Sequence, residues 1–265
     1  MAAGSDRTRD DEMPADAELD FAAPARSRKG RGAATNPQNR FSAFATISLP
    51  GADTAGAKTE YLRDTSKRII AFNDSPDVGF RASLNPYRGC EHGCIYCYAR
   101  PGHEYLGFSA GLDFETKIVV KENAPELLRA ELSARAWQPQ LLAMSGVTDC
   151  YQPLERRLEL TRRCLQVLAE FRNPVAIVTK NFLVTRDCDY LAELARVNAA
   201  AVIVSLTTLD AELARKLEPR ASAPPKRLEA VAQLRAAGIP VGVNLAPIIP
   251  GLTDEEIPAL VAAAA

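Results

Sequence analysis

The sequence predicts an α/β protein whose parallel sheet curls into a partial barrel. Two observations lead to this fold class. From Arg81 onward, short apolar runs typical of strands alternate with amphipathic stretches that carry helix signals. Residues with distinctive chemistry follow the ends of these runs, and a curled parallel sheet places its chemistry at the carboxyl ends of its strands. The alternation itself favours right-handed βαβ units.

The predicted strands are short apolar runs bounded by polar or turn-forming residues. A brief candidate ends near Asn85, ahead of a cysteine-rich stretch. We expect this strand to share the parallel sheet with the later runs. Those runs are Lys117–Lys121, Leu141–Met144, Val175–Thr179, Ala201–Leu206 and Pro240–Ala246.

The predicted helices carry recognisable start and stop signals. Asn123 is suited to cap a helix that has Pro125 at its first position. Leu154–Phe171 keeps a helical period throughout, with its charges on one face, and predicts one continuous helix. Asp187–Val197 and Pro225–Ala237 have the same character, and Gly238 is expected to end the latter.

The chain divides into three parts. Residues 1–40 are polar and rich in Ala, Gly and Pro, so they bury too little apolar surface to offset the entropy of ordering and are expected to be a disordered charged tail. Acidic residues come first in this tail and basic residues follow, which fits a solvated linker and also a nucleic-acid contact. Residues 41–80 are expected to form an N-terminal extension packing on the core, and residues 81–265 the partial barrel. Because the chain reaches Ala265 inside a predicted helix, we expect the last strand and helix of the barrel to be lacking.

Composition places the protein among ordinary globular proteins and argues against several classes. The formal net charge is -1 over 265 residues, so no global basic field points to nucleic acid. No apolar run approaches the ~18 residues needed to span a bilayer. The N-terminus lacks the apolar core of a secretory signal. We therefore expect a cytoplasmic protein without membrane association.

Three cysteines lie in one short stretch that reads C-E-H-G-C-I-Y-C, namely Cys90, Cys94 and Cys97. Thiolates are the ligands that iron–sulfur clusters use. A cubane cluster has four irons, so three cysteines leave one iron without a protein ligand. A small molecule can be chelated and reduced at that iron.

Three other interpretations of the cysteines fit less well. A closed zinc site needs a fourth ligand, and His92 and His103 have the wrong spacing to supply it. A ferredoxin-type carrier needs a fourth cysteine in the pattern, whereas Cys150, Cys164 and Cys188 lie on scattered later segments. Disulfides are not expected in a chain with this clustering and no secretory signal.

The cysteine spacing, with Tyr96 just before the third cysteine, resembles that of the radical S-adenosylmethionine (SAM) enzymes. The resemblance implies a 4Fe-4S cluster on Cys90, Cys94 and Cys97, whose remaining iron binds the amino and carboxylate groups of SAM. It also implies a (β/α)6-type partial barrel, with SAM lying over the strand ends.

Three motifs resemble the branch of the radical SAM family that is related to spore photoproduct lyase. They read N-P-Y-R-G-C-E-H-G-C-I-Y-C-Y-A-R, G-L-D-F-E-T-K-I-V-V-K-E-N-A-P-E-L-L and T-D-C-Y-Q-P-L-E. The similarity extends from about Phe41 to the end of the chain.

The resemblance also implies a set of SAM-binding residues. Ser145 and Gly146 lie in the segment that receives the SAM amino group, although the usual G-G-E form is absent. Lys180 and Ser205 match positions that contact SAM, where an ammonium group suits the carboxylate and a hydroxyl suits the ribose or carboxylate. The residues alone also allow a strand-end lysine that reaches solvent and an ordinary strand-end hydroxyl.

Two tyrosines and one glycine bear on the radical chemistry. Tyr96 and Tyr98 match a tyrosine pair of the lyase proposed to pass a hydrogen atom back towards SAM, and Tyr96 is also expected to stack near the adenine. For Tyr98 a plain packing role fits as well. Gly146 stands where the lyase carries its hydrogen-donating cysteine. Cys150 is close but offset, and an inert buried cysteine fits it better than a relocated donor.

Further candidates surround these positions. Asp149 and Glu155 are suited to orient substrate or SAM, and Asp149 also to cap the helix that follows. His92 and His103 are expected to hydrogen-bond the backbone of the cysteine stretch rather than act in catalysis. Residues 247–254, P-I-I-P-G-L-T-D, resemble the adenine-side loop of the family and also fit a plain strand-to-helix turn.

Together these features predict a radical SAM enzyme that cleaves SAM reductively and abstracts hydrogen from an unknown substrate. Such an enzyme needs an electron donor of the flavodoxin or ferredoxin type. Two alternatives stay open. One is a nucleic-acid repair or modification enzyme with the same chemistry, whose partner is nucleic acid. The other is a non-catalytic iron–sulfur or zinc binding module.

Overall fold

A computed structural model describes residues 28–42 and 58–265 of the chain. Its larger sheet is open and has six strands in the order β2-β3-β6-β7-β8-β9. All neighbouring pairs are parallel except β2 with β3. The strands are β2 (Ile70–Phe72), β3 (Ala82–Leu84), β6 (Leu142–Met144), β7 (Val175–Thr179), β8 (Ala200–Ser205) and β9 (Val241–Asn244).

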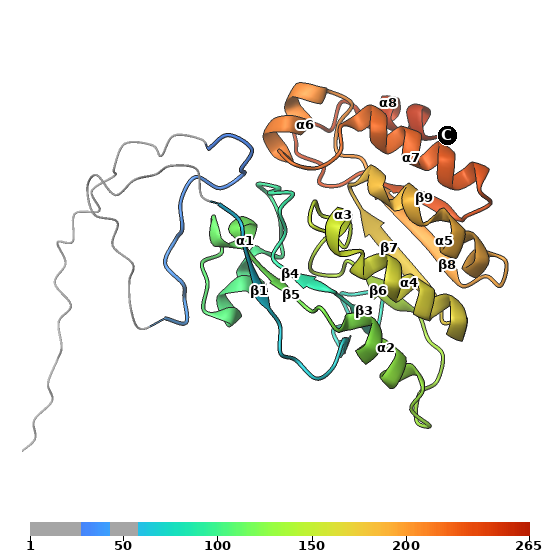
Figure 1. Cartoon of the computed structure of the whole chain (residues 1–265). Helices are drawn as coiled ribbons and strands as arrows, with labels where there is room; N and C mark the ends of the chain where they lie inside the picture. Colours follow the sequence, from blue (N-terminus) through green and yellow to red (C-terminus); the bar gives the residue numbers. More distant parts are fainter. Residues whose placement is uncertain (1–27, 43–57) are drawn as a thin grey trace, which may run out of the picture.

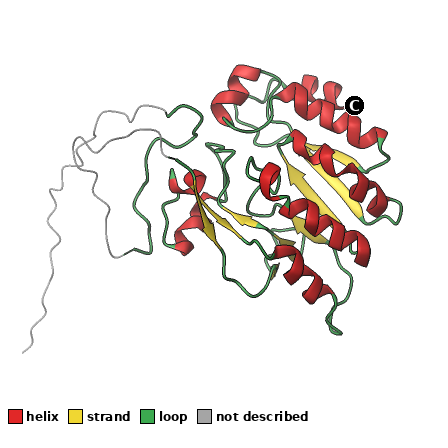
Figure 2. Ribbon diagram, in the orientation of Figure 1, coloured by secondary structure: helices red, strands yellow, loops and turns green. Residues whose placement is uncertain are grey.

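Helices lie along one face of this sheet, between successive strands of the chain (Figure 1, Figure 2). The α/β class is therefore confirmed, and a partial barrel stays our interpretation of the open parallel sheet. The long helices are α2 (Ala124–Leu132), α4 (Leu160–Phe171), α5 (Cys188–Ala195) and α7 (Pro224–Ala236). The remaining ones are η1 (Arg100–Leu106), α1 (Asp113–Thr116), α3 (Glu155–Leu158), η2 (Phe182–Asp187), α6 (Ala211–Leu217) and α8 (Ile257–Ala264).

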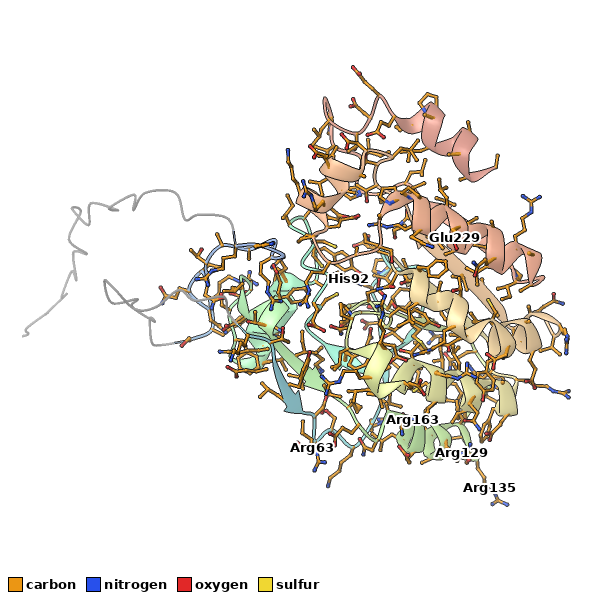
Figure 3. The ribbon with its side chains drawn as sticks, turned by 45° about the horizontal axis from the view of Figure 1, so that its top comes forward. Arg63, His92, Arg129, Arg135, Arg163 and Glu229 are labelled. Carbon is orange, nitrogen blue, oxygen red and sulfur yellow. The ribbon has the colours of Figure 1, made fainter. Side chains whose placement is uncertain are left out.

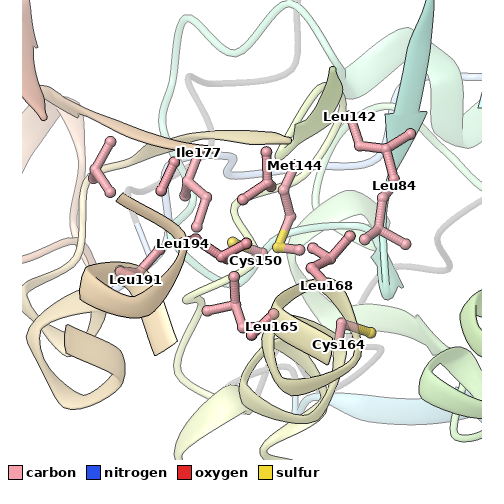
Figure 4. Close-up of a cluster of buried hydrophobic side chains, with 14 of the residues drawn as sticks. Leu84, Leu142, Met144, Cys150, Cys164, Leu165, Leu168, Ile177, Leu191 and Leu194 are labelled. Carbon is pink, nitrogen blue, oxygen red and sulfur yellow. The ribbon is translucent and has the colours of Figure 1, made fainter. Parts of the chain in front are cut away.

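The hydrophobic core lies between the helices and the large sheet (Figure 4). Met144 and Ile177 on the strands meet Leu165 and Leu168 on α4, and all four side chains are fully buried. These residues come from periodic apolar positions of the sequence, which is why both the strands and the helices that supply them could be predicted.

The run Lys117–Lys121 forms a strand, but the prediction that it joins the parallel sheet is wrong. It forms β5 (Lys117–Val120), which pairs with β1 (Glu60–Arg63) and β4 (Tyr87–Arg88) in a separate sheet of order β1-β5-β4. Between β4 and β5 the chain carries a 3-10 helix and a four-residue helix, and a parallel return to the large sheet needs a longer crossover helix.

The predicted continuous helix Leu154–Phe171 is also wrong, because it breaks into α3 and α4 at Glu159. Glu159 adopts a left-handed conformation with φ of 52°. The carboxylate of Glu155 accepts hydrogen bonds from the backbone N–H groups of Thr161 (3.0 Å) and Arg162 (3.3 Å). A side chain thus supplies partners for the first N–H groups of α4, in the way an N-cap does.

The helix-end signals were confirmed only in part. Gly238 follows α7 with φ of 74°, as predicted. Asn123 occupies the N-cap position of α2, but its side chain makes no capping hydrogen bond, and Pro125 is the second helical residue rather than the first.

The expected tail is ordered at its C-terminal end, so the prediction of disorder is wrong for residues 28–40. The backbone N–H groups of Gly32 and Ala33 donate to the buried carboxylate of Glu115 in α1 at 3.0 and 2.8 Å. Figure 1 shows this segment beside α1. Residues 1–27 of the predicted tail and 43–57 of the predicted extension lie outside the described residues, while residues 58–80 contribute β1 and β2.

No helix in the described part of the chain is long and apolar enough to cross a membrane.

Candidate active site

The cysteine loop, residues 89–98, follows β4 and is packed closely against its surroundings. Gly93 has φ of 68°, in the left-handed region that favours glycine, and a Cβ there would lie 2.7 Å from Glu115 Oε2. Arg100 donates to the carbonyl of Cys94 at 2.8 Å and to Glu115 at 2.6 Å. The loop is therefore held by side chains from the segment that follows it.

The three thiols of the loop are free, with Cys90 and Cys94 buried and Cys97 partly exposed. Burial raises the pKa of Cys90 well above its usual range, and the fields of Asp149, Cys94 and Cys97 add to this. Burial likewise raises the pKa of Cys94 to about 12. Metal binding takes the thiolate, so it would release protons from these buried thiols.

Residues 217–222, which we call the clamp segment, run from the last residue of α6 towards α7. They bind the cysteine loop through backbone hydrogen bonds. The N–H of Ile95 donates to the carbonyl of Leu217 at 2.9 Å, and the N–H of Arg220 donates to the carbonyl of His92 at 3.1 Å. Arg220 also pairs with buried Glu91 at 2.9 Å. Nothing in the sequence motifs pointed to this segment.

Tyr96 of the cysteine loop and Lys180 come together at the end of β7. The Lys180 ammonium at the end of β7 lies 5.9 Å from the centroid of the Tyr96 ring. The Tyr96 hydroxyl donates to the carboxylate of Glu218 and lies 3.2 Å from the hydroxyl of Thr207. Burial, with the charges of Cys94 and Glu218, raises the pKa of this phenol.

Tyr98 reaches from the cysteine loop to the end of β6. Its ring is 78% exposed, and its hydroxyl donates to the carbonyl of Gly146. Ser145, at φ of 81°, turns the chain there, and its hydroxyl accepts the N–H of Cys150 at 3.0 Å. Ser145, Gly146 and Tyr98 are thus neighbours, while Cys150 is buried in the core.

Ser205 ends β8 and is 1% exposed. Its carbonyl accepts a hydrogen bond from Arg227 of α7 at 3.1 Å. The predicted position at a strand end is confirmed, and the residue is buried rather than at the open surface.

Asp149 does not cap the helix that follows, which was one of its two predicted roles. Its carboxylate accepts hydrogen bonds from Thr179 (2.8 Å), from the N–H of Lys180 (2.8 Å) and from the N–H of Tyr151 (2.9 Å), and it lies 3.3 Å from His92 Nδ1. Burial alone would raise the pKa of Asp149, but His92 and these donors outweigh it and lower the pKa to about 2. Asp149 therefore ties the ends of β6 and β7 to the cysteine loop.

Glu155 is fully buried, so the prediction that it orients substrate or SAM loses its basis. It accepts from Arg186 at 2.7 Å and from the Tyr87 hydroxyl, besides capping α4. All of these partners belong to the surrounding fold, and their hydrogen bonds offset the cost of burying the carboxylate.

The two histidines differ from their predicted role. His92 lies in the interior, whereas Arg63 and Arg135 project outward (Figure 3). Its ring binds side chains rather than loop backbone, with Nε2 3.1 Å from the amide nitrogen of Asn181 and Nδ1 facing Asp149. His103 packs against aromatic rings, and burial lowers its pKa to about 4, so the ring is neutral at pH 7.

The comparisons with known proteins decide the family. The family model described as the radical SAM superfamily matches residues 84–264, more than half of the chain. The chain belongs to the radical SAM superfamily.

Relatives of this radical SAM chain include uncharacterized protein Rv2578c of Mycobacterium tuberculosis, 42% identical over 187 residues, which are 69% of this chain and 55% of that protein. Uncharacterized protein MJ0683 of Methanocaldococcus jannaschii is 29% identical over 76% of this chain and 72% of that protein. The chain thus spans about half the length of the first of these relatives.

Among solved structures, the radical SAM chain is similar to spore photoproduct lyase complexed with dinucleoside spore photoproduct, with a TM-score of 0.56 and 17% identity over 78% of this chain and 58% of that one. For a lyase variant with bound AdoMet and dinucleoside spore photoproduct, the TM-score is 0.54 and the identity is 18%. The match covers 77% of this chain and 57% of that one. At this identity the likeness shows the fold.

Membership in the radical SAM superfamily implies a 4Fe-4S cluster and SAM, and the cysteine loop fits the cluster. Each cubane iron takes a separate thiolate, so three cysteines suit three of its corners. Among the described residues, no three His, Cys, Asp or Glu side chains are gathered tightly enough for a single metal ion. Three free thiols on one loop can supply those three thiolates.

Several residues of this radical SAM site escaped the sequence analysis. Arg227 left a readable signal, because it shares the buried face of α7 with Ala230 and Leu234 at helical spacing. Glu218 and the Glu115–Arg100 pair left no such signal in the sequence. Glu218 meets Tyr96, and Glu115 meets Arg100, only in the folded chain.

Proposed function

We propose that this chain is a radical SAM enzyme that binds a 4Fe-4S cluster through Cys90, Cys94 and Cys97 and abstracts hydrogen from a substrate still to be found. When bound, the reduced cluster supplies one electron to the SAM sulfonium, which yields methionine and a 5′-deoxyadenosyl radical. The observation that carries the proposal is a well-packed three-cysteine loop whose Tyr96 ring meets the Lys180 ammonium at the end of β7.

The remaining residues would bind and orient SAM. Lys180, with its ammonium beside the Tyr96 ring, suits the SAM carboxylate. Ser145 and Gly146, at the turn after β6, and Ser205, at the end of β8, lie where the family resemblance puts further SAM contacts. Tyr98 is exposed at the same edge, which suits a side chain that passes a hydrogen atom. An electron donor of the flavodoxin or ferredoxin type in a reducing cytoplasm would complete the reaction.

The first test is anaerobic loading with iron and sulfide, followed by reduction, addition of SAM and an assay for 5′-deoxyadenosine. We expect the wild type to form it and Cys94→Ala to lose at least about 100-fold in rate, since the cluster needs all three thiolates. Cys188→Ala, which removes a thiol outside the loop, is the matched control and is expected to keep full activity. A fully loaded wild type that neither binds nor cleaves SAM contradicts the proposal and favours a non-catalytic iron–sulfur module.

A nucleic-acid substrate is the second candidate, because the similar lyase structures hold a dinucleoside. Gly146 stands where the resemblance places the lyase's donor cysteine, and Cys150 is 1% exposed in the core, so the lyase reaction itself is not supported. Binding of single-stranded and duplex DNA, titrated against salt, tests this candidate. A steep loss of affinity with salt supports it, and no binding at low salt contradicts it.

A further inference from the structure

A buried ion pair lies directly behind Tyr96. Glu218 in the clamp segment and Arg227 at the start of α7 are each 2% exposed. The Glu218 carboxylate accepts from Arg227, from Thr207 at 2.7 Å and from the Tyr96 hydroxyl. Arg227 also donates to the carbonyl of Ser222 at 2.7 Å and to that of Ser205 at 3.1 Å.

This network joins separate parts of the chain. It connects the cysteine loop through Tyr96, the end of β8 through Ser205, and the start of α7 through Arg227. The Thr207 hydroxyl also lies 3.1 Å from the carbonyl oxygen of Ala246 in the loop after β9. A buried pair costs desolvation free energy that apolar residues would not, so it is weak evidence for stability and better evidence for fixing geometry.

The network also determines what the Tyr96 hydroxyl can do. Its hydrogen points to an ionised carboxylate, and a hydrogen atom leaving it would first have to break that charge-assisted bond inside the protein. Burial alone would raise the pKa of Glu218, but Arg227 and the hydrogen-bond donors outweigh it and lower the pKa, so the acceptor stays charged. The ring, by contrast, faces the Lys180 ammonium.

We propose that Glu218 and Arg227 are positioning residues that anchor the Tyr96 hydroxyl, so that Tyr96 serves as a fixed aromatic wall for SAM and not as a hydrogen-atom relay. This inference rests on the proposed function. Tyr98, which is exposed and hydrogen-bonded only to a backbone carbonyl among the contacts the structure gives it, then remains as the relay tyrosine.

The experiment compares Tyr96→Phe, Glu218→Gln and the double variant. Equilibrium dialysis of the cluster-loaded, unreduced protein gives the SAM dissociation constant without turnover, and the rate of 5′-deoxyadenosine formation is measured at saturating SAM. We expect each single variant to bind SAM about tenfold more weakly and to keep the saturating rate within about twofold, because each weakens or removes the Tyr96–Glu218 hydrogen bond. Glu218→Gln also neutralises the partner of Arg227, which Tyr96→Phe leaves unchanged. The double variant should bind SAM no more weakly than the weaker single variant, since both substitutions act on the same Tyr96–Glu218 hydrogen bond.

Glu212→Gln on α6, whose carboxylate is 78% exposed, is the matched control and should leave both quantities unchanged. Tyr96→Phe decides the matter even where Glu218→Gln fails to fold, because it leaves the pairs of Glu218 with Arg227 and Thr207 intact. A Tyr96→Phe variant with normal SAM affinity and no turnover overturns the inference, as do additive losses in the double variant. A wild type that does not bind SAM overturns the proposed function instead.

Discussion

At the scale of single residues, the carboxylate of Asp149 is held by several donors. It receives donors from β7, from the turn after β6 and from His92. Its pKa is about 2 in the folded chain against an ordinary 3.8. A lowered carboxyl pKa contributes stability that is present above pH ~4 and is lost as the pH falls towards 2, and the shift corresponds to about 2 kcal/mol.

We therefore predict that Asp149→Asn lowers the free energy of unfolding by about 2 kcal/mol at pH 7 and that the difference from wild type shrinks between pH 4 and pH 2. Denaturant unfolding of the cluster-free protein at pH 7, 4 and 3 measures this. Asp77→Asn, at an exposed position, serves as the control and should be neutral. A deficit that is the same at every pH would mean that Asp149 acts by shape and not by charge.

Site residues could be proposed from the sequence where a short stretch of it carries the signal, and not where the signal depends on a distant partner. Cys90, Cys94 and Cys97 carry their chemistry in their spacing, while Lys180 follows one recognisable strand and Ser205 ends another. The roles of Asp149 and Glu155 were not predictable, because their partners, such as His92 and Arg186, lie far away in sequence. A carboxylate after a strand looks the same in sequence whether it faces a ligand or a buried donor.

At the scale of elements, the break at Glu159 gives the sharpest test. A left-handed conformation costs an ordinary residue about 1 kcal/mol or more, and glycine adopts it without that cost. We predict that Glu159→Gly leaves stability unchanged or raises it by up to about 1 kcal/mol, offset in part by the entropy of the unfolded chain. In one continuous helix the same change would cost about 1 kcal/mol.

Denaturant unfolding measures this difference, with Gln166→Gly as the matched control. Gln166 is exposed in the interior of α4, so glycine there should cost about 1 kcal/mol. Equal losses at both positions would contradict the break between α3 and α4.

Element types were easier to predict than their placement. Apolar periodicity identified β6, β7, β8 and β9 and the positions of α4, α5 and α7, because one buried face imposes a period on the sequence. It did not identify the shorter η2 and α6. It could not assign β5 to the smaller sheet, since a strand's own pattern does not say which neighbour pairs with it. The Leu154–Phe171 pattern likewise continued through Glu159, where a side-chain cap and not the apolar period sets the boundary.

At the scale of the whole molecule, the cysteine loop is held between parts of the chain that are distant in sequence. The clamp segment contacts it from one side, and residues 28–42 with α1 contact it from the other. Composition predicted disorder for residues 28–40 because those residues bury little apolar surface of their own. They are ordered through backbone hydrogen bonds to a buried carboxylate, which composition does not record.

The N-terminal segment gives the prediction that bears on this arrangement. A Cβ at Gly32 would lie 1.8 Å from the carbonyl oxygen of Gly93, a distance that no small adjustment relieves. Gly32→Ala must therefore displace the segment from the cysteine loop, and its hydrogen bond to Glu115 with it. We expect amide hydrogen exchange in residues 28–42 to quicken by about tenfold or more and the cluster absorbance to bleach faster in air, since opening removes cover from the loop.

Gly79→Ala is the control, because nothing lies within 4 Å of a Cβ there, and it should leave both rates unchanged. The two readouts separate two ideas about the segment. Faster exchange with unchanged bleaching would mean that residues 28–42 order the N-terminus without shielding the cluster. Unchanged exchange in Gly32→Ala would contradict the close contact itself, because a segment that tolerates a methyl group at that position is not packed against Gly93.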